Sequence, residues 1–400
     1  FQSDITSIPD EEYFGCTGYT GSIIIPDTVT HIGRKAFYGC TGFTGSLIIP
    51  NSVTNIGIRA FYDCSNLQQL EINCDNLTSI SYGVFQNCRS ITGTLKFPDT
   101  LIEISVCAFE GCSEISNEVT FPPKLETIGN YAFKQCSKLK LNINFPDTLK
   151  SIGTVSFYEC TGITQIQNLG NNLQEIPDSS FYGCQNIQGT LVIPNSITSI
   201  GSYSFKGCSK LNGLQINSFS LINISNGAFS DCTSFNCDLT LPYCVEYLGI
   251  SAFENCPFNG HITSLGSSLK KIDNYCFKNT NFTGDLTIPD SVVEIGIHAF
   301  YSCKGFNGEL KLSSSLKKLG DYAFYSCSNL HGDLSLPDSL TEMGVYAFFR
   351  CYAFDGQLHI GIGMKEIPEN AFSYCGFTGQ LMIPSNIEFV NKSAFYRCKS

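Results

Sequence analysis

One arrangement of apolar and polar positions recurs along the whole chain. An aromatic residue, usually within the pattern Ala-Phe-x-x-Cys, appears 17 times between Tyr13 and Phe395. Fourteen of the 16 intervals between these aromatics are 24 residues long, and the other two are 23 residues long. A repeat of this length and regularity predicts a solenoid, in which each repeat forms one coil and contacts only its neighbours.

Residues 43–64 form one repeat and predict a short strand near its start. Leu47 and Ile49 lie two residues apart, and a period of two is typical of a strand with one buried face. Pro50 ends this strand because proline has no N–H group to donate to a neighbour. The strands of successive coils are expected to stack as one long parallel sheet, with neighbours about 4.8 Å apart. Short turns and irregular or 3-10 segments would form the outer side.

The second half of the same repeat leads the chain back toward the next strand. Val53 and Ile56 are a second apolar pair, and Gly57 is expected to take a turn position with a positive φ. Phe61 and Cys64 then close the coil. Because no coil can bury these apolar residues alone, stacking should place Phe on Phe and Cys on Cys in continuous ladders.

We predict a single domain over residues 1–400, because no linker interrupts the repeat. Both ends stop without the polar cap that a solenoid needs, so we expect the chain to be a fragment of a longer protein. Three coils represent the predicted structural ladder, at Phe61, Cys64, Phe181, Cys184, Phe324 and Cys327.

The repeat resembles a known family. Its form in residues 47–64, Leu-x-Ile-Pro-x-Ser-Val-Thr-x-Ile-Gly-x-x-Ala-Phe-x-x-Cys, is similar to the BspA-like leucine-rich repeat of the Treponema type. The segment Gly-Phe-Thr-Gly-Ser-Leu at residues 42–47 resembles the variant found in mucosal protist parasites. The resemblance covers nearly the whole chain and implies a curved, right-handed leucine-rich-repeat solenoid. It also implies a surface or secreted protein, without enzymatic activity, that adheres to a protein or glycan partner on host cells, matrix or other microbes.

Composition excludes several classes of protein. The chain has 35 acidic and 24 basic residues, which give a net charge of −11, and no basic run. Nucleic-acid binding needs clustered Lys and Arg, so we do not expect it. The sequence has no stretch of about 18 apolar residues, so we do not expect this segment to insert into a membrane. No metal-ligand spacing, nucleophile elbow or phosphate-binding loop occurs in the sequence, so we expect neither a cofactor nor an enzyme.

Cysteine is the most unusual feature of the composition. Of 21 cysteines, 16 occupy the repeat position between Cys16 and Cys398, and Thr280 takes that position in the remaining coil. The cysteines could form a metal or redox array, or a ladder of reduced thiols that pack as small apolar groups. Coils about 4.8 Å apart hold Cβ atoms too far apart for an ordinary disulfide, which needs roughly 3.5–4.5 Å. We therefore predict reduced packing thiols.

Three acidic residues form the first candidate binding site. Asp285, Glu309 and Asp333 precede the buried Leu in consecutive coils, so they should point outward and form an acidic column. Like charges side by side are unfavourable in a sheet. The column would bind a basic partner or a cation, or else it is an ordinary solvated rim. Lys311, on the same face, could neutralise part of the column.

Two further groups of residues suggest contacts or modification. Tyr301 and Tyr325 follow the ladder Phe in consecutive coils, where they could bind a partner or pack between turns. Asn281 lies in a predicted outer turn and is the best candidate for a glycan. The possible N-glycosylation sites are Asn76, Asn223, Asn281 and Asn391.

Three functions are compatible with this sequence. The first is adhesion to a host or microbial surface, at the cell surface or after secretion. The second is a self-assembling structural layer or fibre, because blunt solenoid ends could stack on one another. The third is an immune-type pattern-recognition ectodomain, which usually carries disulfide-bonded caps.

Overall fold

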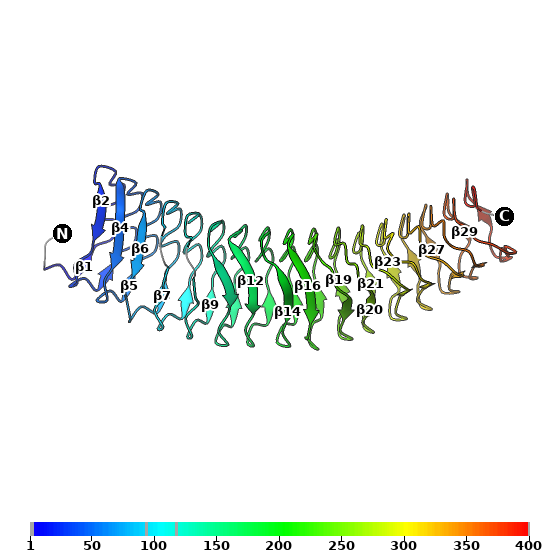
Figure 1. Ribbon diagram of the computed structural model, residues 1–400, viewed down its shortest axis with the longest axis horizontal. Helices are drawn as coiled ribbons and strands as arrows, with labels where there is room; N and C mark the ends of the chain where they lie inside the picture. The colour runs from blue at the N-terminus through cyan, green and yellow to red at the C-terminus, as the bar shows by residue number, and fades with distance from the viewer. Residues whose placement is uncertain (1–3, 93–94, 117–118, 399–400) are drawn as a thin grey trace. The chain divides into compact units, whose positions relative to one another are not determined.

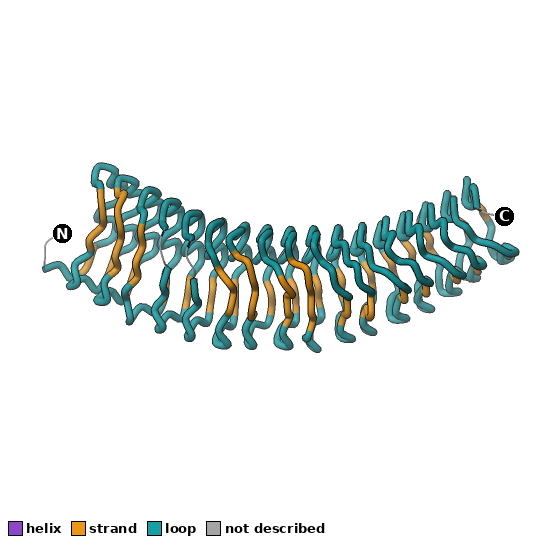
Figure 2. Tube along the Cα trace, in the orientation of Figure 1, coloured by secondary structure: helices purple, strands orange, loops and turns teal. Residues whose placement is uncertain are grey.

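A computed structural model of the chain describes residues 4–92, 95–116 and 119–398. It contains two compact units, residues Phe1–Gly189 and Thr190–Ser400. Each unit is a stack of coils built from strands and turns, and no helix occurs within the described residues (Figures 1 and 2). The predicted solenoid of 24-residue coils is therefore confirmed, whereas the single domain over residues 1–400 stays a prediction.

The first series of strands lies at the predicted Leu-x-Ile positions. These strands pair in parallel, but in the described residues they form separate small sheets, such as β2-β4-β6 and β22-β24. In chain order the series comprises β2 (Gly21–Ile24), β4 (Phe43–Ile49), β6 (Gln69–Ile72), β10 (Leu141–Asn144), β12 (Ile163–Asn168), β14 (Gly189–Ile193), β16 (Leu211–Ile216), β18 (Leu239–Leu241), β20 (Ile262–Leu265), β22 (Leu286–Thr287), β24 (Leu310–Lys311), β26 (Leu334–Ser335) and β28 (Leu358–His359).

A second series, which the sequence pattern did not predict as strands, gives the more continuous sheets. Each of its strands has two residues, and the second is usually a buried Ile that pairs in register with the Ile of the next coil. The series comprises β1 (Ser7–Ile8), β3 (His31–Ile32), β5 (Asn55–Ile56), β7 (Ser79–Ile80), β8 (Glu103–Ile104), β9 (Thr127–Ile128), β11 (Ser151–Ile152), β13 (Glu175–Ile176), β15 (Ser199–Ile200), β17 (Asn223–Ile224), β19 (Tyr247–Leu248), β21 (Lys271–Ile272), β23 (Glu294–Ile295), β25 (Lys318–Leu319), β27 (Glu342–Met343), β29 (Glu366–Ile367) and β30 (Phe389–Val390).

A column of stacked Phe rings fills the core of each unit. In the first unit, the rings of Phe157 and Phe181 lie 5.3 Å apart with an angle of 1° between their planes. In the second unit, Phe300 and Phe324 lie 5.0 Å apart at 4°. The six residues of the predicted structural ladder all have side chains with 0% exposure. Like residues therefore stack on like residues along the axis of each unit.

The outer turn of every coil holds two residues in the left-handed region. In the coil of Phe61 they are Arg59, with φ of 55°, and Asp63, with φ of 56°. This conformation disfavours residues other than glycine by roughly 1–2 kcal/mol each. Backbone hydrogen bonds to the next coil offset that cost, because Arg59 N–H donates to Tyr82 O at 2.9 Å and Asp63 N–H donates to Gln86 O at 2.8 Å.

Gly57 does not have the positive φ that the sequence analysis expected, so that expectation was wrong. The glycine is needed for space. A Cβ atom on Gly57 would lie 2.5 Å from Arg34 N and 2.6 Å from Gly33 C of the preceding coil. The two backbones approach too closely here for a side chain. Gly57 is therefore required by the close contact between coils and not by the conformation of the turn.

Truncation of one ladder ring tests the Phe column. We expect Phe181→Ala to lower the free energy of unfolding by about 3–5 kcal/mol, because the substitution leaves a cavity between two stacked rings. Equilibrium unfolding in urea measures this change. Phe219→Ala is the matched control, because Phe219 is 67% exposed and removing it opens no cavity. Equal effects of the two substitutions would show that the ladder ring does not support the core.

Candidate functional site

The acidic column lies at the start of the first-series strands of the second unit. Asp285, Glu309 and Asp333 directly precede β22, β24 and β26, and all three are exposed. Two of these carboxylates accept a hydrogen bond from the backbone of the following coil. Glu309 N–H donates to Asp285 Oδ1 at 2.8 Å, and Gln357 N–H donates to Asp333 Oδ1 at 2.6 Å. The structure therefore brings Asp285 and Glu309 together and gives the carboxylates of Asp285 and Asp333 a structural role.

Other coils have the same hydrogen bond at the position equivalent to Asp285. His261 N–H donates to Asp238 Oδ1 at 2.7 Å, and Ser46 N–H donates to Ser22 Oγ at 3.0 Å. A short side chain with an oxygen atom thus accepts an N–H group at the point where the strand ladder begins. The partial positive charge of that N–H stabilises the carboxylate. The unfavourable repulsion within the column is therefore partly offset by the backbone.

This arrangement requires a glycine in the next coil. The sequence analysis did not identify that requirement. A Cβ atom on Gly308 would overlap with Asp285 Oδ1, and one on Gly356 would overlap with Asp333 Oδ1. The side chain of one coil thus covers the glycine of the next. The recurring Gly-x-Leu motif in the sequence was the signal that could have revealed this contact.

Lys311 is exposed in β24, and within the described residues its ammonium group forms no ion pair. Partial neutralisation of the column by Lys311 stays a prediction. The charge of Lys311 acts on Asp290. The pKa of Asp290 is lowered because Ser314 donates two hydrogen bonds to it, from its N–H and from its hydroxyl, and the charge of Lys311 lowers it further.

Tyr301 and Tyr325 lie on a different part of the coil, in the outer turns. Their rings stack at 4.8 Å, and Tyr325 also stacks on Phe349 at 5.1 Å. A second column, which includes His298 and Tyr322, runs beside the first, and the rings of Tyr322 and Tyr325 lie 5.7 Å apart. These rings are half-buried and cover one another's faces. No contact joins the tyrosines to the acidic column in the part of the chain that the structure describes.

The four possible glycosylation sites differ in accessibility. Asn76, Asn281 and Asn391 are exposed, whereas Asn223 lies in β17 and is half-buried. The amide group of Asn391 donates to Glu366 Oε2 at 3.1 Å. Among the described residues, the side chain of Asn281 forms one long hydrogen bond, in which its amide group donates to Asn259 Oδ1 at 3.4 Å. Asn281 therefore has a reachable amide nitrogen in an outer turn.

The cysteines form a ladder of unpaired thiols. No disulfide joins any of the 21 cysteines, and most ladder thiols donate to the carbonyl oxygen of the aromatic residue in the preceding coil, as Cys64 does to Phe37 O at 3.1 Å. Burial raises the pKa of Cys184 to about 12, so this thiol stays neutral and unreactive at physiological pH. Among the described residues no group of three or more His, Cys, Asp or Glu side chains could hold a metal ion.

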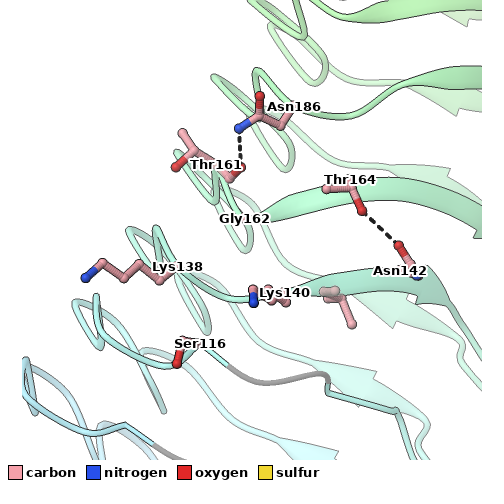
Figure 3. A pocket seen from close by; sticks show the side chains of 9 residues that line it. Ser116, Lys138, Lys140, Asn142, Thr161, Gly162, Thr164 and Asn186 are labelled. Atoms are coloured by element: carbon pink, nitrogen blue, oxygen red, sulfur yellow. Dashed lines mark hydrogen bonds between the residues drawn. The ribbon is translucent and has the colours of Figure 1, made fainter.

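A groove lined mainly by polar residues lies in the first unit and was not predicted from the sequence. It has a volume of about 660 Å³ and lies beside the start of β10 and β12 (Figure 3). Thr164 Oγ1 donates a hydrogen bond to Asn142 Oδ1 at 2.9 Å, and Asn186 Nδ2 donates one to the backbone carbonyl oxygen of Thr161 at 2.8 Å. The lining residues are Ser116, Lys138, Lys140, Leu141, Asn142, Thr161, Gly162, Thr164 and Asn186.

Comparisons with known proteins agree with this architecture. A family model described as a BspA type leucine rich repeat region matches residues 1–116, 114–190, 186–307 and 270–400. The chain is similar in structure to a leucine-rich repeat protein from Bacteroides ovatus, with 25% identity, a TM-score of 0.57, and coverage of 93% of this chain and 86% of that one. No curated protein matches the sequence. Within the described residues, no helix is long and apolar enough to cross a membrane.

Two further bacterial structures are less similar. A leucine rich cell surface protein from Faecalibacterium prausnitzii has 20% identity and a TM-score of 0.38, with coverage of 94% of this chain and 88% of that one. A leucine rich repeat protein from T. pallidum has 27% identity and a TM-score of 0.33, with coverage of 48% and 77%. The likeness to protist sequences stays a prediction.

Substitutions at Asp333 test its hydrogen bond to the next coil. Asp333→Ala should lower the free energy of unfolding by about 1 kcal/mol, because Gln357 N–H loses its acceptor. Asp333→Asn keeps an oxygen at the same place and should leave stability close to that of the parent protein. Thermal unfolding of the two variants measures the difference. Equal stability of the two would mean that the hydrogen bond contributes nothing.

The thiol ladder predicts a loss of stability at alkaline pH. Burial raises the pKa of Cys40 from 9.0 to about 12, so above pH 9 the unfolded chain loses thiol protons that the folded chain retains. Stability is therefore fully present below pH 9 and falls as the pH rises toward 12. Urea unfolding between pH 7 and pH 11 should show this fall.

Thiol titration of the denatured, unreduced protein provides the control. We expect most of the 21 cysteines to react. A count below about five would mean that disulfides and not packed thiols form the ladder, because a disulfide sulfur has no proton to titrate.

Proposed function

Because the chain belongs to the BspA-type leucine-rich repeat family, we propose that it is a non-enzymatic adhesion protein. It would present columns of exposed side chains to a protein or glycan partner at the cell surface or after secretion. The column of Asp285, Glu309 and Asp333 is the proposed contact surface for a basic protein partner. Lys311 would lie at its margin, whereas Tyr301 and Tyr325 would form a separate contact surface in the outer turns.

One observation carries this proposal: the inward and outward positions of the coil vary independently. The inward Leu of the first-series strands is kept in coil after coil, as in Leu286, Leu310 and Leu334. The next position, which is exposed, is Thr287 in one coil and Lys311 in the following one. Since the core fixes the fold, the outward residues are free to match a partner. A scaffold of this kind suits recognition of a large surface.

The acidic column has the charge that such a contact needs. Its backbone hydrogen bonds use Oδ1 of Asp285 and of Asp333, which leaves the second oxygen of each carboxylate available to a ligand. Charges of one sign on successive coils would attract a partner of opposite charge and orient it along the unit. Attraction of this kind weakens as salt concentration rises.

Self-assembly is the second candidate function. Parallel strands with unpaired N–H and C=O groups can pair with the strands of another copy in the same way that neighbouring coils pair with each other. Monomers at every concentration in a sizing series would exclude this second function.

The charge of the acidic column can be removed without loss of its hydrogen bonds. The variant Asp285→Asn/Glu309→Gln/Asp333→Asn keeps each acceptor oxygen and should fold normally. Flow cytometry would measure binding of the labelled protein to epithelial cells and to bacterial cells. We expect the triple variant to bind about tenfold less, since three favourable charge contacts are lost.

A matched control removes the same charge elsewhere. Glu71→Gln/Asp75→Asn/Asp99→Asn changes three exposed acids of the first unit and should bind like the parent protein. Undiminished binding of the column variant would exclude the acidic column as the contact surface. Failure of the parent protein to bind any of the cells would contradict the adhesive function itself.

A further inference from the structure

We propose that the polar groove beside β10 and β12 binds an acidic saccharide, a glycan chain that carries carboxylate or sulfate groups. The inference rests on the proposed binding function. The groove would be a second binding surface, in the first unit. Its ligand would be negatively charged, whereas the acidic column suits a positively charged partner.

The groove lies beside β10 and β12, where the pairing of two first-series strands shifts in register. Leu141 of β10 pairs with Ile163 of β12, but Asn142 pairs with Gln165, so the register shifts and Thr164 becomes an extra residue. A bulge of this kind redirects a side chain and opens the sheet locally. The volume of about 660 Å³ lies within the range of small-molecule sites.

Lysine supplies the charge along the described part of the groove. Among the residues that the structure describes, Lys138 and Lys140 are the only ionisable ones in the lining, although the chain as a whole has a net charge of −11. Lys138 forms an ion pair with Glu114 at 2.7 Å, whereas Lys140 has no ion pair among the residues that the structure describes. The ammonium group of Lys140 is therefore available to an anionic group in the groove.

The uncharged lining groups match a hydroxyl-rich ligand. Figure 3 shows the side chains of Asn142, Thr161, Thr164 and Asn186 around the groove. Asn142 Oδ1 accepts from Thr164, which leaves the amide group of Asn142 without a protein partner among the described residues. Amides and hydroxyls both donate and accept hydrogen bonds, as the hydroxyl groups of a sugar do.

Other anionic ligands fit this groove less well. No aromatic residue lines it, and peptide recognition usually relies on buried aromatic or apolar anchors. Stacking of nucleic-acid bases also needs aromatic side chains, and a nucleic-acid backbone needs more than two basic residues. Two lysines among amides and hydroxyls therefore favour a saccharide with widely spaced negative charges.

Direct binding measurements can test this assignment. The probes are a hyaluronan octasaccharide, which carries carboxylates, and a heparin hexasaccharide, which also carries sulfates, with neutral maltohexaose as the comparison. We expect titration calorimetry to detect one or both acidic saccharides and not maltohexaose. The double variant Lys138→Gln/Lys140→Gln should bind about tenfold more weakly, and salt should weaken binding of the parent protein because it screens these charges.

A matched control and a competing ligand sharpen the result. Lys304→Gln/Lys317→Gln removes two exposed lysines of the second unit and should leave saccharide affinity within about twofold of the parent value. Equal binding of maltohexaose, no binding of either acidic saccharide, or no effect of the groove variant would overturn the proposal. Tighter binding of a hexaglutamate peptide than of the saccharides would also overturn it, in favour of an acidic peptide ligand.

The cell-binding assay separates this inference from the proposed function. If the parent protein binds cells but neither acidic saccharide, only the groove assignment fails. If it binds an acidic saccharide in the groove but no cells, the adhesive function fails and the groove assignment stands.

Discussion

The structure depends on each coil lying in register on its neighbour within a unit. Backbone hydrogen bonds between coils set the spacing, and Phe rings at centroid distances such as 5.0 Å and 5.7 Å fill the space between them. Because a single coil has too little apolar area to fold alone, its stability comes from the coils on either side. The left-handed turns and the close approach at Gly57 persist because this stacking holds them in place.

Many polar side chains serve the stacking and not a ligand. Asp285 and Asp333 accept backbone N–H groups from the next coil, and Cys64 donates its thiol proton to the carbonyl oxygen of Phe37. Cysteine suits that position because it is small, apolar and still a weak donor. A column of like residues on a solenoid is therefore ambiguous, since the repeat that creates a binding surface also creates structural columns. A charged atom that forms no hydrogen bond with the backbone is therefore a better guide to a binding site than the column of like residues itself.

The two candidate surfaces differ in how they arise. The acidic column follows from the repeat, because equivalent positions in successive coils place Asp285 beside Glu309. The groove lies at an irregularity in strand pairing, where Thr164 is an extra residue of β12 between the partners of Leu141 and Asn142. Regular stacking produces ridges and flat faces, so a concave site needs an irregularity of this kind.

The sequence by itself determined the solenoid, the length of its coil and the identity of its core residues, because the period of the apolar positions reports which side chains face inward. It placed Asp285, Glu309 and Asp333 on a common outer face for the same reason. Tertiary structure alone decided the second series of strands, the true role of Gly57 and the groove at Asn142 and Thr164. These features depend on which backbone atoms meet between coils, and such meetings are set by hydrogen bonds between residues more than 20 positions apart, which no local pattern encodes.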